Sequence, residues 1–109
     1  MNKLKVIDIG HTNLSIDTAM LDLETKISQL NFEGDYKVVK VIFGHGSGAL
    51  KQTIKGWIEE QEGRFKAIIY GEDYNVFNKV AVDMRSECKL RDDHDFGRKN
   101  SGILYIWFW

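Results

Sequence analysis

The chain of 109 residues contains no proline and a single cysteine, Cys88. One cysteine cannot form an internal disulfide, which is typical of a reducing compartment and predicts a cytoplasmic protein with Cys88 as a small buried side chain. Without proline, the turns must be made by glycine, asparagine, aspartate and serine. The positions of the 10 glycines are therefore informative.

Long apolar runs and an excess of positive charge are also missing. No apolar run approaches the roughly 20 residues of a membrane-spanning helix, and the start of the chain has no secretion signal. The formal net charge of −1, from 15 basic and 16 acidic residues, excludes a domain that clamps phosphates over its whole surface. No cysteine or histidine spacing resembles a structural zinc site. We expect one domain over residues 1–109.

Hydrophobic periodicity predicts alternating strands and helices. Strands are expected at 4–9, 38–43, 65–70 and 103–109, and helices at 15–30 and 49–62, the latter ending at Gly63. The segment 73–88 fits both patterns, and the longer helical match favours a helix. The last strand is apolar on both faces, which predicts a covered strand. The order indicates an α/β fold, a two-layer, sandwich-like βαβαβ(α)β domain with a mainly parallel or mixed sheet.

Three glycines lie close together between a predicted strand and a predicted helix, in the sequence GHGSG. Amides at a helix N-terminus carry the positive end of the helix dipole, and a glycine turn lets an anion approach them. The loop lacks the Gly-Lys-Ser/Thr ending of a P-loop and the third glycine of a dinucleotide fingerprint. It is either a tight turn without a ligand or a phosphate site made by Gly44, His45, Gly46, Ser47 and Gly48, with Lys51 and Lys55 following.

Three motifs resemble the Smr domain family, the small MutS-related modules. The run VIFGHGSGALKQTI resembles the family's HGxGxGxL segment, and Ile7-Asp8-Ile9-Gly10-His11 resembles a variant of its Leu-Asp-x-His-Gly motif. Asn100-Ser101-Gly102 is similar to its closing glycine turn. Relative to the family pattern, His11 lies one place late and Phe43 replaces the leading histidine of the second motif. Residues 73–99 would then be an insertion, a helix and a polar loop, before the last strand.

The resemblance implies binding of branched or structured DNA or RNA, and endonuclease activity in which the motif aspartate and histidines take part. It makes Asp8, His11 and His45 the candidate catalytic residues, with a divalent metal as the cofactor if the nuclease needs one. Asp8 is the family carboxylate that carries over directly.

The residues themselves support this chemistry independently. Asp8 ends one strand and the glycine loop ends the neighbouring one, so both are expected at the same edge of a parallel sheet. A histidine can act as general acid or base, and loop amides with Lys51 can stabilise charge on a phosphate. The alternatives are exposed loop histidines and an Asp8 that only holds its own turn. We interpret Asp92, Asp93, His94 and Asp95 as a solvated loop rather than a metal site.

Charge is distributed unevenly along the chain. Residues 36–58 contain four lysines and no acid, whereas residues 15–35 contain five acids and only Lys26. Lys51 and Lys55 lie four apart on one helix face and could extend a short phosphate path, which predicts weak, salt-sensitive binding. Two other functions stay open. One is a non-catalytic protein-interaction module using the acidic first helix and the aromatic C-terminus, and the other is binding of a small phosphate-bearing metabolite.

Overall fold

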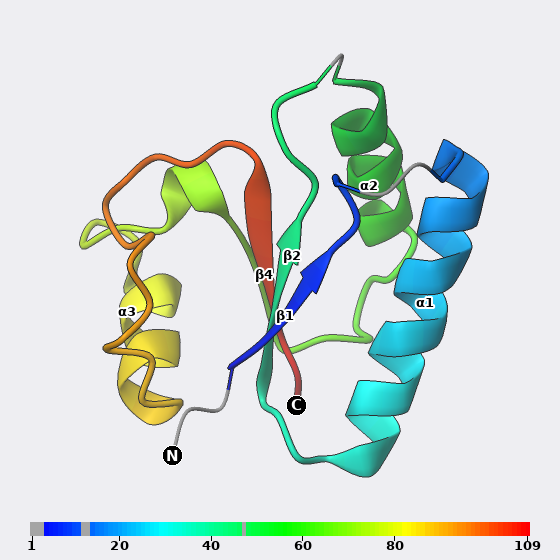
Figure 1. Cartoon of the computed structure of the whole chain (residues 1–109). Coiled ribbons are helices and arrows are strands. Elements are labelled where there is room, and N and C mark those ends of the chain that lie inside the picture. The colour runs from blue at the N-terminus through cyan, green and yellow to red at the C-terminus, as the bar shows by residue number, and fades with distance from the viewer. Residues whose placement is uncertain (1–3, 12–13, 47) are drawn as a thin grey trace.

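A computed structural model describes residues 4–11, 14–46 and 48–109 (Figure 1). The elements follow the order β1 (Leu4–Asp8), α1 (Ile16–Glu33), β2 (Val38–Ile42), α2 (Ala49–Glu59), β3 (Ala67–Tyr70), a 3₁₀ turn η1 (Gly71–Asp73), α3 (Lys79–Glu87) and β4 (Ile103–Trp107). Each strand and helix expected from the sequence is present. The differences lie at their ends.

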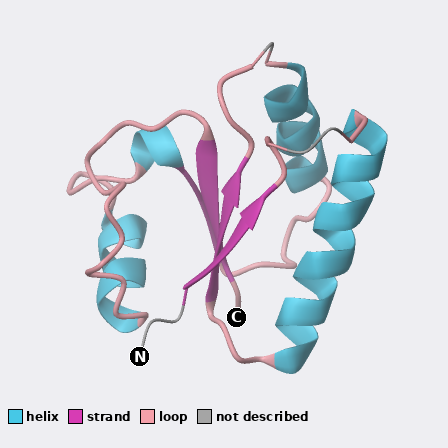
Figure 2. Cartoon of the chain, viewed as in Figure 1, coloured by secondary structure: helices cyan, strands magenta, loops and turns pink. Residues whose placement is uncertain are grey.

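The four strands form one mixed sheet in the order β1-β2-β4-β3. β1 and β2 run parallel, with Asp8 beside Ile42, while β4 is antiparallel to both β2 and β3. Figure 2 shows the strands crossing the middle of the molecule with helices on either side. The expected mixed α/β class is confirmed, and β1 with β2 is the parallel pair of the described sheet.

The two longer helices cover one face of the sheet. α1 begins after Ser15, whose hydroxyl accepts a hydrogen bond from the Thr18 amide at 3.3 Å, and ends at Gly34 in the left-handed region. The apolar cluster beneath α1 and α2 combines helix residues with inward strand residues: Ala19, Leu23, Ile27, Ile54, Ile7, Val39, Val41, Leu104 and Ile106. This face corresponds to the two layers predicted from the sequence.

α3 adds a third layer on the opposite face (Figure 1). Asn78 caps it by accepting hydrogen bonds from the amides of Val80 and Ala81. Ala81 and Met84 pack with Cys88 in a second cluster, together with Val38, Ile69, Ile103, Tyr105 and Trp107 of the sheet. β4 thus contributes alternate residues to both clusters, which confirms a last strand covered on both sides. The helical interpretation of 73–88 is correct for Lys79–Glu87.

α2 is shorter than the sequence predicts. It ends at Glu59 rather than at Gly63, because the chain tightens into turns in which the Gln61 amide bonds to the Ile58 carbonyl and the Arg64 amide to the Gln61 carbonyl. Gly63, with a φ of 82°, lies in the second of these turns. In the described part of the chain, no helix is long and apolar enough to span a membrane.

A buried lysine fixes the polar loop that follows α3. Lys40 lies on β2 beneath this loop and is only 8% exposed. Its ammonium group bonds to Asp93 at 2.7 Å and also to Asp95. The Tyr105 hydroxyl donates to the same Asp93 carboxylate. Lys40 therefore belongs to an internal ion cluster, and the acid-free lysine segment of the sequence is in part neutralised by acids from the end of the chain.

Candidate functional site

Three chain turns meet at the carboxyl ends of β1 and β2. After β1, the amides of Ile9 and Gly10 both bond to the Ile42 carbonyl, at 2.9 and 3.2 Å. After β2, the amides of Phe43 and Gly44 both bond to the Gly102 carbonyl, at 2.9 and 3.0 Å. The first motif, the glycine loop and the closing glycine turn are thereby joined through their backbones, as parallel neighbouring strands predict.

Close approach of the backbone leaves little room for a side chain at two of these glycines. A Cβ at Gly10 would lie 2.7 Å from the backbone carbon and oxygen of Phe43, and one at Gly102 would lie 3.0 Å from the Gly44 carbonyl. Because the obstructing atoms are backbone, no side-chain movement can relieve the contact. The close approach brings His45 over Gly102, where its Cε1 would be 3.0 Å from a Cβ.

The side chains of Asp8 and His11 are hydrogen-bonded to each other at the end of β1. Nδ1 of His11 lies 2.7 Å from Oδ2 of Asp8, and Oδ1 of Asp8 accepts from the amides of Gly10 and His11 at 2.9 and 3.2 Å. Partial burial pulls the pKa of Asp8 upward, but the hydrogen bonds from His11 and the two amides outweigh it and hold the pKa below its usual value. Asp8 therefore both holds its own turn and orients the imidazole. With Nδ1 engaged, Nε2 is the nitrogen of His11 left for a ligand.

A cleft of about 380 Å³ lies beside this pair. It is lined by Gly10, His11, Ile16, Phe43, Gly44, His45, Gly46, Gly48, Leu50 and Lys51. Both candidate histidines are in its wall, and they come from different loops. Asp8 does not line the cleft and reaches it through His11.

The N-terminus of α2 also opens on the cleft. Gly48, with a φ of 87°, precedes the helix and supplies no side-chain cap. Helix amides and their dipole favour an anion at this point. Lys51, in the first turn of the helix, is held by two hydrogen bonds: its Nζ donates to Oε2 of Glu72 at 2.8 Å and to the Ser101 carbonyl at 3.0 Å.

The remaining predicted phosphate ligands are placed differently. Lys55 lies outside the cleft, with its Nζ 5.6 Å from the centre of the Tyr70 ring. Ser47 falls outside the described residues. The structure therefore brings together the loop glycines, both histidines and Lys51, and leaves Lys55 on the neighbouring surface.

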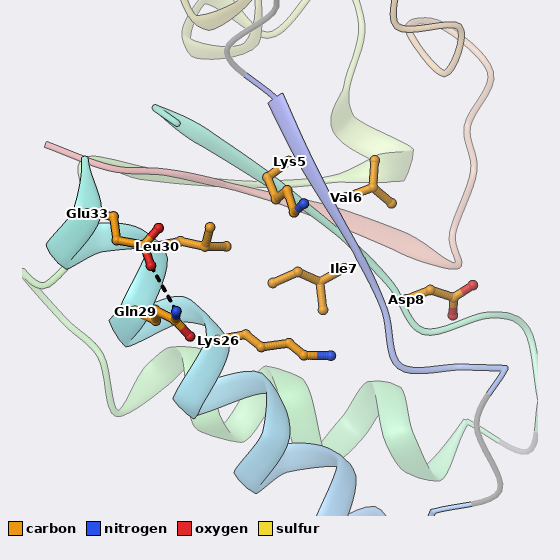
Figure 3. A pocket seen from close by; sticks show the side chains of 8 residues that line it. All are labelled: Lys5, Val6, Ile7, Asp8, Lys26, Gln29, Leu30 and Glu33. Carbon is orange, nitrogen blue, oxygen red and sulfur yellow. Dashed lines mark hydrogen bonds between the residues drawn. The ribbon is translucent and has the colours of Figure 1, made fainter. Parts of the chain in front are cut away.

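A second hollow, of about 430 Å³, lies between β1 and α1 (Figure 3). Its polar residues are occupied by neighbours. Lys26 pairs with Asp22 at 2.9 Å, and Gln29 donates to Glu33 at 2.8 Å. Figure 3 shows Asp8 at one end, turned away from the α1 side chains. The chemistry-bearing residues thus point to the smaller cleft as the candidate site.

The described residues do not include a ready-made metal centre. Among them, no three histidine, cysteine, aspartate or glutamate side chains lie close enough together to hold an ion. Asp93 and Asp95, from the acidic stretch near the C-terminus, bond to Lys40 instead. The described donor set consequently does not fit a divalent ion held by protein side chains alone.

Sequence reasoning missed Glu72 as part of this region. It lies 21 residues from Lys51 along the chain, in a stretch without a motif. The one nearby residue in the sequence that could have indicated a close contact here is Gly71. In the structure, a Cβ at Gly71 would lie 1.9 Å from the Asn100 carbonyl oxygen. That packing brings η1 to the closing glycine turn and Glu72 to Lys51.

Comparison with known proteins supports the architecture. No protein-family model and no curated protein sequence matches the chain. Among solved structures, the chain is similar to the Smr domain of Thermus thermophilus MutS2, with a TM-score of 0.61 and 14% sequence identity. The likeness covers 96% of this chain and 98% of that one. The chain therefore has the fold of an Smr domain.

Proposed function

We propose that this Smr-like domain binds DNA or RNA, with a backbone phosphate seated in the cleft between His11 and the glycine loop. We also propose that it cleaves the phosphodiester there, using Asp8, His11 and His45. The observation that carries the proposal is the shared cleft, in which two histidines from different loops flank the start of α2. The single buried cysteine fits a reducing compartment, so we place this activity in the cytoplasm.

Binding follows from the shape and polarity of the cleft. Gly44, Gly46 and Gly48 line it without side chains that would keep a phosphate away from the backbone. The helix dipole of α2 favours a negative charge at the same point. Lys51, the lysine among the described residues that line the cleft, is paired with Glu72, so its charge is partly neutralised toward a phosphate. We therefore expect modest affinity and a shallow salt dependence.

Cleavage follows from the orientation of His11. Asp8 holds Nδ1, so Nε2 can accept the proton of an attacking hydroxyl, from water or from a ribose, as its oxygen bonds to phosphorus. His45 then donates a proton to the leaving oxygen as the phosphorus–oxygen ester bond breaks. Loop amides at the start of α2 stabilise the added negative charge on the phosphate oxygens.

Binding is tested by fluorescence anisotropy of labelled single-stranded, duplex and branched DNA and RNA at two salt concentrations. We expect saturable binding of at least one class at low salt, weakened by salt. The Gly46→Asp variant, which places a carboxylate in the cleft, should bind at least about tenfold more weakly, because it repels the phosphate. Absence of binding for every nucleic acid at low salt would contradict the proposal.

Cleavage is tested with the same oligonucleotides and the variants His11→Ala and His45→Ala. Each should cut about 100-fold or more slowly than the wild type, as expected for loss of a general acid or base. His94→Ala is the matched control, because His94 is an exposed loop histidine outside the cleft. Equal rates for all three variants would remove the catalytic part of the proposal and leave a binding domain.

A protein-interaction function has one specific observation in its favour. Val76 and Phe77, just before α3, are 66% and 94% exposed. The aromatic C-terminus offers less, since Trp107 and Phe108 are buried and Trp109 alone of the three is exposed. Partner recovery that survives Lys51→Glu with Lys55→Glu, but is lost in Phe77→Ser, would favour this function over nucleic-acid binding.

A further inference from the structure

Glu72 pairs with Lys51 and feels the positive charge of Lys55 on the same helix. Oε2 of Glu72 accepts from Lys51 at 2.8 Å. Burial raises the pKa of Glu72, but the hydrogen bonds from Lys51 and from the Glu72 backbone amide, with the positive charges of Lys51 and Lys55, outweigh it and lower the pKa below its usual value. The carboxylate is thus ionised at neutral pH and lies in the field of both lysines.

Among the described residues, one oxygen of the Glu72 carboxylate is left without a hydrogen bond, which is unusual for a purely structural ion pair. Within the described part of the chain, Oε1 of Glu72 is buried and has no hydrogen-bond partner. An ionised oxygen without a donor is unfavourable, because it has lost its water and gained no replacement. Lys51, by contrast, keeps a second bond to the Ser101 carbonyl, so its position does not depend on Glu72 alone.

The lysines are spaced for an extended anion. They lie four residues apart on α2, about 6 Å along the helix axis. Lys51 lines the cleft, and Lys55 lies beyond it toward Tyr70. A strand whose first phosphate sat in the glycine loop would therefore carry its next phosphates along this side of α2, over the position of the Glu72 carboxylate.

We propose that Glu72 is a specificity-determining residue that occupies the place of a backbone phosphate beside Lys51, so that a nucleic-acid strand must displace it to bind along α2. This inference rests on the proposed nucleic-acid binding and adds a selection to it. A ligand with a single phosphate contacts only the glycine loop and does not reach the position of Glu72. A polynucleotide, with consecutive phosphates, can exchange the carboxylate for a phosphate and so free Lys51 to bind it, with Lys55 one turn further along α2.

The test compares Glu72→Gln with Glu62→Gln in the anisotropy assay. Both remove one negative charge, but Glu62 is an exposed residue of the turn after α2. Glu72→Gln should bind an oligonucleotide about threefold or more tightly than either the wild type or Glu62→Gln. The slope of log affinity against log salt concentration for Glu72→Gln should become steeper by about 0.7 to 0.9, the change expected for one added phosphate contact. Binding of a mononucleotide should change by less than about twofold.

A second substitution assigns the gain to Lys51. In Lys51→Gln with Glu72→Gln, the tighter binding should return to about the wild-type level. Circular dichroism with thermal unfolding checks that each variant folds. Glu72→Ala is measured in parallel, so that the comparison still stands if Glu72→Gln fails to fold.

The outcomes separate the two proposals. If the wild type binds and Glu72→Gln is no tighter than Glu62→Gln, the role of Glu72 is wrong while nucleic-acid binding stands. If the double variant keeps the whole gain, Lys51 is not the group released, and the inference is again wrong. If neither the wild type nor any Glu72 variant binds nucleic acid, the proposed function and this inference both fail.

Discussion

Nδ1 of His11 lies 2.7 Å from Oδ2 of Asp8, and His11 carries this contact into a cleft that Asp8 itself does not line. Asp8→Asn keeps the shape of the carboxylate and removes its charge. We expect cleavage to fall by about 10- to 100-fold, because the imidazolium formed when His11 takes a proton loses its counter-charge. Nucleic-acid affinity should change by less than about twofold. The two quantities are measured on the same oligonucleotide, and a parallel loss of both would show that Asp8 supports binding instead.

Gly10→Ala should destabilise the fold by about 1 to 3 kcal/mol, because its Cβ would meet the Phe43 backbone at 2.7 Å. Gly46→Ala is the control, since a Cβ there meets nothing within 4 Å. Urea unfolding followed by tryptophan fluorescence measures both variants. Equal midpoints would mean that the turn after β1 moves aside at no cost.

Lys40→Met should lower the free energy of unfolding by about 3 kcal/mol or more, because it leaves the carboxylates of Asp93 and Asp95 without their cation. Lys26 pairs with Asp22 and is far more exposed than Lys40. Lys26→Met should therefore lower the free energy of unfolding by less than about 1 kcal/mol. Urea unfolding compares the two. A similar small effect of both substitutions would show that the Lys40 cluster adds nothing to stability.

Alkaline pH should unfold the domain through Lys40, Tyr74 and Tyr105. Burial raises the pKa of both tyrosines. Burial lowers the pKa of Lys40, but the bonds to Asp93 and Asp95 outweigh it and raise the pKa overall. Each folded pKa is above the unfolded one, so these groups stabilise the fold fully below about pH 10 and progressively less as the pH rises above it. Absorbance at tyrosinate wavelengths, followed with circular dichroism, should show Tyr74 and Tyr105 ionising together with unfolding. Their ionisation in the folded protein would contradict this.

Local patterns predicted much of the architecture. The helix expected from residue 15 begins with Ser15 as its cap, because capping depends on residues three apart, and the alternating apolar residues of β4 are buried on both faces. The glycine loop lies beside the end of β1 because neighbouring parallel strands end at the same edge. Each of these features depends on short spacing or on a general rule of sheets, which a single sequence contains.

Charge pairing was the part that could not be predicted. Lys40 and Lys51 belong to a segment without acids, yet Lys40 pairs with Asp93 and Asp95, and Lys51 pairs with Glu72. These contacts span 53, 55 and 21 residues. They depend on how the segments before and after α3 lie over the sheet, which composition and periodicity do not determine.

The strand order has a consequence for how the protein is made. β4 follows the other described elements in the sequence but lies between β2 and β3, so these two strands have no hydrogen-bonded neighbour in common until Ile103–Trp107 is made. A ribosome delivers the chain from its N-terminus, and the central strand of this sheet therefore emerges after both of the strands it joins. During synthesis the domain can form β1, α1 and β2 early, but the site at Gly44 and Gly102 can close only after residues 102–107 have left the exit tunnel.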